Sequence, residues 1–316
     1  MTKKHELDMT KGSISKSIIR FSIPLIFSSL LQLLYNAADL IVVSRFAGSS
    51  AMGSVGATTS LNALLVNLCM GMSIGAAVLV SRHFGAHNRE GLRRSVHTAM
   101  LLSAIMGICA AVLGLLLARP VLELMGTPEE VIDGSVTYIS IIWAALPATM
   151  VYNYGAAILR AVGDTKRPIY ILAMTGIVNV ILNLVLVIVF HLDVAGVAIS
   201  TAFANLLSAM AVVYALMHSN GDYRLDLKQL RLYREELKEI IRVGAPAGIQ
   251  SSLFSLSNSV VLSAVNGFGA DTLTGYAAAS NIEGFVYVGM DAFHQATLTA
   301  VSQNYGAKNA KRINRI

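Results

Sequence analysis

Two similar octapeptides show how this chain is organised: SRHFGAHN at residues 81–88 and SQNYGAKN at residues 302–309. Upstream of each, equivalent residues lie 222 positions apart, so that Pro24 falls opposite Pro246. A whole lobe is therefore repeated. Repeated halves within an apolar chain are the usual construction of secondary transporters, whose halves rock about a central binding site. The first hypothesis is transport.

The second copy of the lobe is shorter than the first. Roughly 130 residues separate Gly85 from a polar segment at 219–222, whereas the chain ends ten residues after Gly306. About 126 residues of a second lobe are then missing. We therefore expect a C-terminally truncated fragment of a protein of roughly 440 residues with six helices in each lobe.

The composition is that of a membrane protein. Hydrophobic residues make up 55% and charged residues 13%, and the mean hydropathy is +0.63. Stretches of 18 or more mostly apolar residues can cross a bilayer. Eight such spans are predicted: 17–44, 54–81, 95–118, 134–159, 168–190, 195–217, 239–266 and 275–302.

These spans predict an all-α integral membrane protein. Residues 1–221 form a six-helix N-terminal bundle, and residues 239–316 contribute the first two helices of the second bundle. Between them, 222–238 has leucines mostly at helical spacing, which predicts an amphipathic linker helix at the cytoplasmic interface.

Basic residues indicate the orientation of the chain, because Lys- and Arg-rich loops remain cytoplasmic. The N-terminus and the loops at 82–94, 160–167 and 224–242 are basic, and only Arg45 and Arg119 fall on the other side. The N-terminus is therefore predicted to be cytoplasmic, and the net charge of +6 follows from this bias. Nucleic-acid binding is not expected, since it needs a basic soluble face.

Asp39 is the clearest candidate for a functional residue. A charge at the bilayer centre costs about 2.5–3.5 kcal/mol, so such residues usually face a cavity. Gln32, Asn36 and Asp39 follow helical spacing with Tyr35 beside them, and we expect this face to line the interior of the lobe. In the alternative, Asp39 lies near the outer end of its span and pairs with Arg45.

Two pairs of polar residues extend this candidate site. Asn179 and Asn183 are four residues apart in the fifth span, as are Thr201 and Asn205 in the sixth. If these faces meet Asp39, the lobe holds either a proton site or a small oxygen-lined cation site. Otherwise, they only cross-bond helices, at about 0.6 kcal/mol each.

The repeat assigns the ion site to the first lobe. Asn36 has the counterpart Asn258, but Asp39 falls opposite Val261. The remaining acids within spans are Glu283 and Asp291, with His294 and Gln295 near Asp291. These residues either contact substrate or form hydrogen bonds between helices.

The sequence resembles the multidrug and toxic compound extrusion (MATE) family, in its bacterial branch with the acidic site in the N-terminal lobe. The resemblance covers the whole chain and rests on Pro24, Asp39, the RAVGDTKRP loop at 160–168, the paired Gly-Ala-x-Asn loops and the six-plus-six repeat. It implies two six-helix bundles around a V-shaped cleft. It also implies export of small organic cations by antiport with protons or sodium ions.

The same resemblance implies roles for individual residues. It places Asp39, Asn179, Asn183 and Thr201 at the cation-coupling site, and Pro24 at a bend in the first helix. Several members of the family have an aspartate where this chain has Asn183, and the missing charge favours a proton over sodium. Polar residues expected to line the substrate cleft are Gln32, Tyr35, Asn36, Asn205, Asn258, Glu283, Asp291 and His294.

The family also implies a monomeric, multi-pass protein of the bacterial cell membrane, without a cofactor and without a metal other than a sodium ion at the coupling site. Burial disfavours an ionised carboxylate, so Asp39 can take up a proton. We expect protonation to bend or straighten the first helix at Pro24 and release substrate outward.

Two other functions compete with this one. A lipid-linked saccharide flippase of the same superfamily would share the repeat, but its cavity should be rich in Arg or Lys for pyrophosphate. A membrane enzyme would need a catalytic constellation, whereas His191 lies in a loop and His294 stands alone. An enzyme is therefore not expected.

Overall fold

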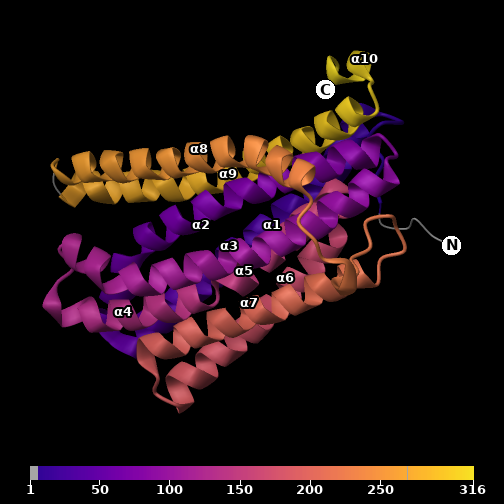
Figure 1. Cartoon of the computed structure of the whole chain (residues 1–316). Helices are drawn as coiled ribbons and strands as arrows, with labels where there is room; N and C mark the ends of the chain where they lie inside the picture. Colours follow the sequence, from indigo (N-terminus) through magenta and orange to yellow (C-terminus); the bar gives the residue numbers. More distant parts are fainter. Residues whose placement is uncertain (1–5, 269) are drawn as a thin grey trace.

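The computed structural model describes residues 6–268 and 270–316, and these residues are almost entirely helical (Figure 1). The α-helices are α1 (Ile14–Val42), α2 (Gly48–Gly85), α3 (Arg89–Leu124), α4 (Glu129–Ala144), α5 (Leu146–Ala161), α6 (Lys166–Leu184), α7 (Asp193–Met217), α8 (Arg234–Asn266), α9 (Ala270–Gly306) and α10 (Ala310–Ile313). Two π-helical turns, Val43–Ala47 and Val185–Val189, follow α1 and α6. The all-α class is as predicted.

Among the described residues, five helices are long and apolar enough to cross a membrane: α1, α2, α3, α6 and α7. The bent pair α4 and α5 adds a sixth if the two helices together form one span. Both helices of the α8–α9 hairpin, although predicted to cross, fall outside this set over their described residues. Both sequences carry many Ser, Asn, Gln and charged residues, which lower their hydropathy.

The predicted span at 134–159 is not one straight helix. It is split at Ala145 into α4 and α5, which are bent by 46°. Pro147 is the second residue of α5, where it cannot donate a backbone hydrogen bond and its ring clashes with a continuing helix. The prediction of a single helix was therefore wrong at this point.

Helices α1 to α7 form one bundle, with α3, α5 and α7 packed in succession and α6 lying between α1 and α7. The largest core lies where α2, α3, α5 and α7 meet. Its fully buried side chains include Val80, Val96, Tyr154, Ile158 and Val212. This core holds the end of the bundle at which the N-terminus lies.

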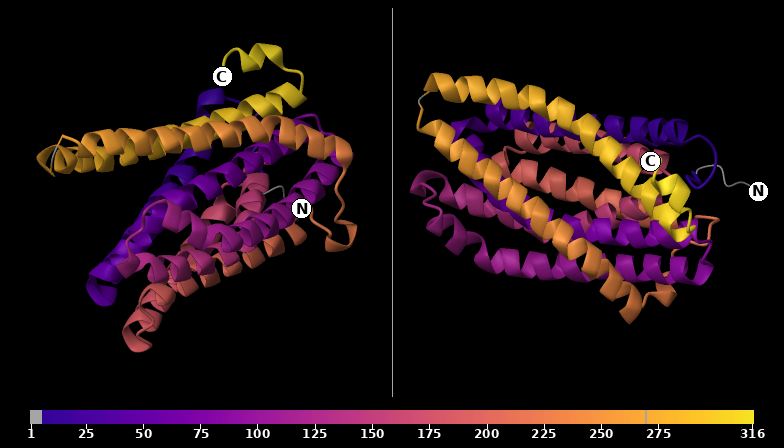
Figure 2. Two further views of the ribbon diagram at one scale, coloured as in Figure 1. Left: turned by 60° about the vertical axis from the view of Figure 1, so that its left-hand side comes forward. Right: turned by 90° about the horizontal axis from the view of Figure 1, so that it is seen from above.

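The α8–α9 hairpin lies across the bundle and diverges from it toward the hairpin tip (Figures 1 and 2). Its α8 packs along α2, and its α9 packs against α1 and α2. Asn67 of α2 donates a hydrogen bond of 2.8 Å to Ser255 of α8. The second copy of the repeat is therefore joined to the bundle through the first two helices of the first copy.

The two repeat copies end in the same backbone turn. His87 and Lys308, which are equivalent positions, have positive φ angles of 53° and 55°. Equivalent asparagines then cap the next helix: Asn88 accepts a hydrogen bond from the Gly91 N–H, and Asn309 accepts one from the Arg312 N–H. The sequence repeat is thus also a repeat of structure.

These turns also touch one another. A Cβ on Gly85 would lie 1.9 Å from the carbonyl oxygen of Gln303, and a Cβ on Gly306 would lie 1.9 Å from that of Arg82. Because Arg82 and Gln303 are equivalent positions, the two copies make the same contact with each other. The close approach requires glycine at both sites.

The linker at 222–238 is not the amphipathic helix that was predicted. It contains a 3₁₀ turn at Leu227–Gln229, and α8 begins at Arg234. Its backbone is held by α3, since His97 accepts a hydrogen bond from the Asp226 N–H and Thr98 accepts one from the Tyr233 N–H. These tertiary bonds replace those that a helix would make.

The N-terminal segment connects both parts of the molecule. The Met9 N–H donates to Gln303 of α9 at 2.9 Å, and Leu7 N–H donates to the carbonyl of Val162 at 3.3 Å. Arg312 donates to the carbonyls of three residues of this segment: Met9, Lys11 and Gly12. The turns predicted to be cytoplasmic all lie at this end of the molecule.

Candidate cation-coupling site

The candidate site lies where α1, α6 and α7 meet, close to the end of α1 away from the N-terminus. Asp39 is half-buried and lies three residues before the last residue of α1. One turn earlier, the Tyr35 hydroxyl donates a hydrogen bond of 3.1 Å to the carbonyl of Ala173 in α6. Tyr35 therefore aligns α1 with α6 and brings Asp39 into the bundle.

Asp39 belongs to a chain of hydrogen bonds. The Asn183 side-chain amide donates to Asp39 Oδ1, and Ser200 Oγ donates to Asn183 Oδ1 at 2.6 Å. Asn183 and Ser200 are buried. Among the described residues, Asp39 and Arg45 form no ion pair, so the alternative pairing at the membrane surface is not found.

Asn179 and Thr201 form a second layer of polar groups between α6 and α7. The Asn179 amide donates to Thr201 Oγ1 at 3.4 Å. The Oδ1 atom of Asn179 is buried and finds no hydrogen-bond partner among the described residues. Because buried acceptors are normally satisfied, this oxygen can accept a bond from a water or a cation.

The two π-helical turns flank the candidate site. The first follows α1 just after Asp39, and the second follows α6 just after Asn183. Each turn contributes one buried valine, Val43 or Val187, to an apolar cluster that also includes Val197 of α7. π-Helical turns often occur at functional sites. No pattern in the sequence indicated either turn.

Sequence reasoning also missed two residues near the candidate site. Ser200 donates a hydrogen bond to Asn183, and Tyr138 of α4 packs against the apolar cluster that contains Val43 and Val187. Ser200 directly precedes Thr201 in α7. The helical spacing that linked Thr201 with Asn205 did not include Ser200, so the sequence did not identify it. The structure therefore adds α4, through Tyr138, to the three helices that surround the site.

The residues predicted to line a substrate cleft are not gathered into one site by any described contact. The side chains of Gln32, Asn36, Asn258, Glu283 and His294 are exposed, and those of Asn205 and Asp291 are half-buried. Helical spacing places Gln32 and Asn36 on the face of Asp39, where Tyr35 and Asp39 bond to α6. A role for Gln32 and Asn36 in lining the interior of the lobe remains a prediction.

Asp291 forms a hydrogen bond within its own helix rather than between helices. It accepts a bond of 2.6 Å from Gln295, one turn along α9. The described hydrogen bond of Asp291 therefore neither bridges two helices nor points to a substrate.

Comparison with known proteins identifies the family. The sequence model of MatE matches residues 24–185 and 246–316. The chain belongs to the MatE family. The two matched segments begin at Pro24 and Pro246, which are equivalent positions in the repeat. The family match therefore supports the internal repeat that the sequence showed.

The relatives of this MatE protein are named for different transported compounds. It is 29% identical to the probable multidrug resistance protein YoeA of Bacillus subtilis (strain 168), over 97% of this chain and 68% of the relative. It is 21% identical to the multidrug export protein MepA of Staphylococcus saprophyticus, over 96% of this chain and 67% of the relative. It is also 21% identical to an FAD transporter of Shewanella oneidensis, over 99% of this chain and 69% of the relative.

Solved structures share the MatE fold. A MATE crystal structure in the bent conformation has a TM-score of 0.89 at 25% identity, and the match covers 100% of this chain and 70% of that one. A transporter of the MOP superfamily from Pyrococcus furiosus has a TM-score of 0.88 at 26% identity, and the match covers 99% of this chain and 70% of that one.

The MatE assignment confirms the predicted class: a multidrug efflux transport family with transmembrane helices and small-molecule substrates. At the family level it also fits a protein that is not an enzyme and that lies in a cell membrane. These comparisons align 96–100% of this chain with 67–70% of each relative or structure, and they do not confirm the prediction of a truncated fragment. The monomeric state and the cytoplasmic N-terminus remain predictions.

Proposed function

We propose that this protein is a secondary active exporter of organic cations that works by antiport with protons, coupled at Asp39. The observation that carries the proposal is the hydrogen-bonded chain from Asp39 through Asn183 to Ser200. It holds a single carboxylate against amide and hydroxyl groups inside the helical bundle. Isolated acids within membrane spans typically mark ion or proton pathways.

The direction of the hydrogen bonds supports protons over sodium. Asn183 presents its N–H to Asp39, and its oxygen is already bonded to Ser200. A sodium ion prefers oxygen ligands, so binding beside Asp39 would require Asn183 to turn and both bonds to break. A proton needs only the carboxylate. Sodium remains the alternative because Asn179 Oδ1 and Thr201 offer oxygens nearby.

The packing of α1 suggests how protonation could reach the second part of the molecule. Protonated Asp39 becomes a hydrogen-bond donor as well as an acceptor, so its preferred partners change. On either side of Pro24, Phe21 and Leu25 are buried in one cluster with Ala292 and Ala296 of α9. A change in the bend of α1 would therefore shift the contact between the two repeat copies.

Antiport then requires that the proton and the drug favour different conformations. A ligand shifts an equilibrium only by its differential affinity for the two states. If protonated Asp39 favours one arrangement of α1 against α9 and the organic cation favours the other, the two cannot be carried in the same direction.

The test is dye efflux from proteoliposomes under an imposed pH gradient, comparing the wild type with Asp39→Asn. We expect gradient-driven efflux in the wild type and its loss in the variant. Glu130→Gln is the matched control, because Glu130 is an exposed acid of α4 outside the hydrogen-bonded chain and outside the predicted cleft residues. A sodium gradient is applied in parallel to distinguish the two ions.

Each outcome decides between the alternatives. Efflux that survives Asp39→Asn would overturn coupling at Asp39 and direct attention to Glu283 and Asp291. Efflux that follows sodium and not the pH gradient would replace the proton. If no dye moves under either gradient, the lipid-linked saccharide flippase becomes the better function.

A further inference from the structure

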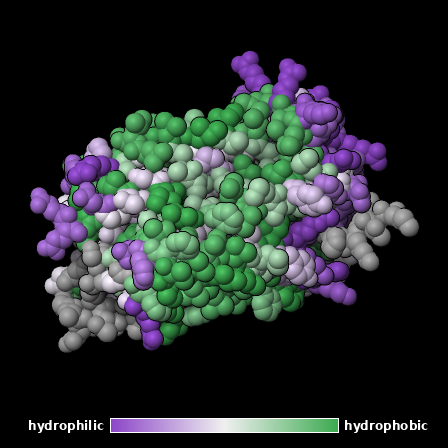
Figure 3. Space-filling view, turned by 90° about the horizontal axis from the view of Figure 1, so that it is seen from below, coloured by the Kyte–Doolittle hydropathy of each residue, from purple (hydrophilic) through white to green (hydrophobic). Residues whose placement is uncertain are grey.

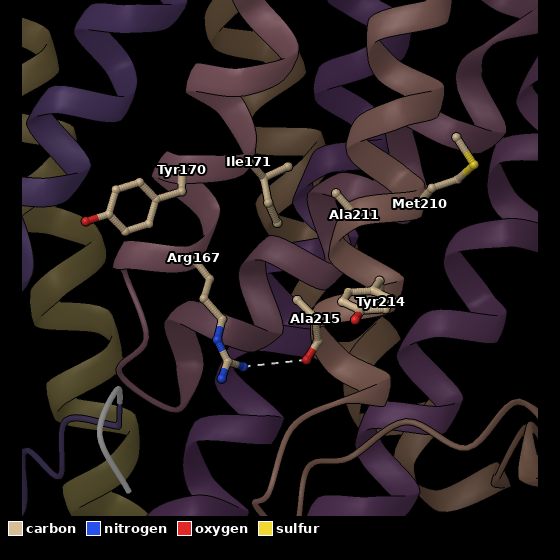
Figure 4. A pocket seen from close by; sticks show the side chains of 7 residues that line it. All are labelled: Arg167, Tyr170, Ile171, Met210, Ala211, Tyr214 and Ala215. Carbon is tan, nitrogen blue, oxygen red and sulfur yellow. Dashed lines mark hydrogen bonds between the residues drawn. The ribbon is translucent and has the colours of Figure 1, made fainter. Parts of the chain in front are cut away.

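A groove outside the coupling site opens between α6 and α7, near the end of the bundle where the N-terminus lies (Figure 4). It has a volume of about 550 Å³. Ile171 of α6 and Ala211 and Tyr214 of α7 line its middle, and Tyr170 and Met210 lie at its two edges with their side chains directed away from each other. Its surface is almost wholly apolar, apart from Arg167 at one end.

Arg167 is held in place at the end of this groove. Its Nε lies 3.2 Å from a carboxylate oxygen of the buried Asp164, and its Nη1 donates to Ser219 Oγ at 2.9 Å and to the carbonyl of Ala215 at 3.5 Å. Among the described residues, Nη2 has no hydrogen-bond partner, although a guanidinium carries two N–H donors there. The side chain is 30% exposed. A fixed cation with free donors is therefore available at the mouth of an apolar groove.

The groove opens on a membrane-facing surface. Exposed apolar side chains follow both helices: Met174, Ile177 and Ile181 on α6, and Phe203, Leu206 and Met210 on α7. Figure 3, which views the side where α7 lies in Figure 1, shows an apolar band between two hydrophilic ends. Tyr170 and Tyr214 are 66% and 64% exposed, and tyrosines at this depth typically sit at the level of lipid headgroups.

Charged groups gather at one end of the groove. Arg167 is paired with the buried Asp164, the exposed Lys166 lies beside it in the sequence, and Glu6 lies near the adjacent Gly221. His218 adds a polar ring at the same end, stacked on Tyr214 with 4.0 Å between the ring centroids. Basic pockets between membrane helices on the cytoplasmic side are sites where anionic lipid headgroups bind.

We propose that the α6–α7 groove binds an anionic phospholipid, whose phosphate is held by Arg167 Nη2 and Lys166 and whose acyl chain lies between Tyr170 and Met210. Phosphate oxygens accept charge-assisted bonds from a guanidinium. The apolar walls match a hydrocarbon chain and offer few groups to a soluble anion. The proposal does not depend on the transported substrate or on the coupling ion.

The test uses a tryptophan placed in the groove as a reporter of the adjacent lipid. Tyr170→Trp is reconstituted in bilayers of phosphatidylcholine with phosphatidylglycerol, and either lipid carries brominated chains, which quench tryptophan on contact. The wild type supplies the blank, since its one tryptophan, Trp143, is buried. We expect this groove reporter to prefer phosphatidylglycerol by about fivefold.

Variants then test the two cations. In the Tyr170→Trp background, Lys166→Gln should lower the preference about twofold, and Arg167→Gln should abolish it. Because Arg167 also holds Asp164 and Ser219, Ala211→Phe provides a second probe that fills the groove without changing charge. It should remove the preference while both cations remain.

The control reporter is Ile241→Trp on α8, which is exposed and lies beside the exposed Arg242 but outside any groove of this kind among the described residues. It should show little preference for phosphatidylglycerol. Equal quenching of the groove reporter by the two lipids would overturn the proposal. An equal preference at the groove reporter and the control reporter would also overturn it, because it would show attraction to basic surface in general.

Discussion

Helices α1 and α8 are equivalent in the repeat but differ in what they carry. Both contain a proline inside the helix, Pro24 and Pro246. In α1, Asp39 reaches Asn183 inside the bundle, whereas the equivalent Val261 of α8 is 48% exposed and apolar. The repeat thus supplies a common scaffold, and the acid that bonds to Asn183 is present in one copy only.

The turns that end the two copies differ much less than α1 and α8 do, because their backbone geometry is nearly the same. Both have a residue at positive φ followed by an asparagine cap, and their glycines contact the partner turn in the same way. The comparison therefore separates two kinds of feature. The turns that support the architecture are present in both copies, whereas the hydrogen-bonded acid at Asp39 is present in one.

The largest effect should come from the prolines. Pro24→Ala restores a backbone hydrogen bond in α1 and removes the bend point near its contact with α9. We expect proton-coupled efflux to fall about tenfold, which corresponds to about 1.4 kcal/mol in a conformational equilibrium. Pro246→Ala should leave coupling largely intact, since α8 has no acid equivalent to Asp39. Efflux assays at a fixed pH gradient measure both, and equal losses would contradict the asymmetry.

A smaller effect is expected at the contact between the two turns. Gly85→Ala and Gly306→Ala should each lower the free energy of unfolding by about 1–3 kcal/mol, because the added Cβ meets a backbone carbonyl that cannot move away. Thermal unfolding in detergent measures this. Gly289→Ala in α9 is the control, since its Cβ would meet nothing within 4 Å. Markedly unequal losses at Gly85 and Gly306 would show that the contact is not symmetric.

The smallest effect is expected at the caps. Asn88→Ala and Asn309→Ala should each cost about 1 kcal/mol, because each side chain accepts a hydrogen bond at the start of the next helix. Aspartate at either position keeps the acceptor and should restore most of the stability. If alanine and aspartate have the same effect in thermal unfolding, the caps do not stabilise these helices.

Much of the fold could be predicted from the sequence, and the failures have identifiable physical causes. Hydropathy located the helices of the α1–α7 bundle, because stretches of this length and composition are stable in a bilayer only as helices. It could not reveal the break at Ala145, which depends on how the chain packs around Pro147. Nor could it show that the 222–238 linker bonds to His97 and Thr98 instead of forming a helix.

The candidate site divides in the same way. The sequence by itself determined the repeat, the helical spans, and the presence of Asp39 in only one copy, because these depend on residue type and on position along the chain. Only the tertiary structure decided that Asp39 meets Asn183, that Ser200 fixes it, and that Gln32 and Asn36 remain exposed. Periodicity indicates which residues share a helical face, but the contacts of that face depend on how helices distant in the sequence pack together.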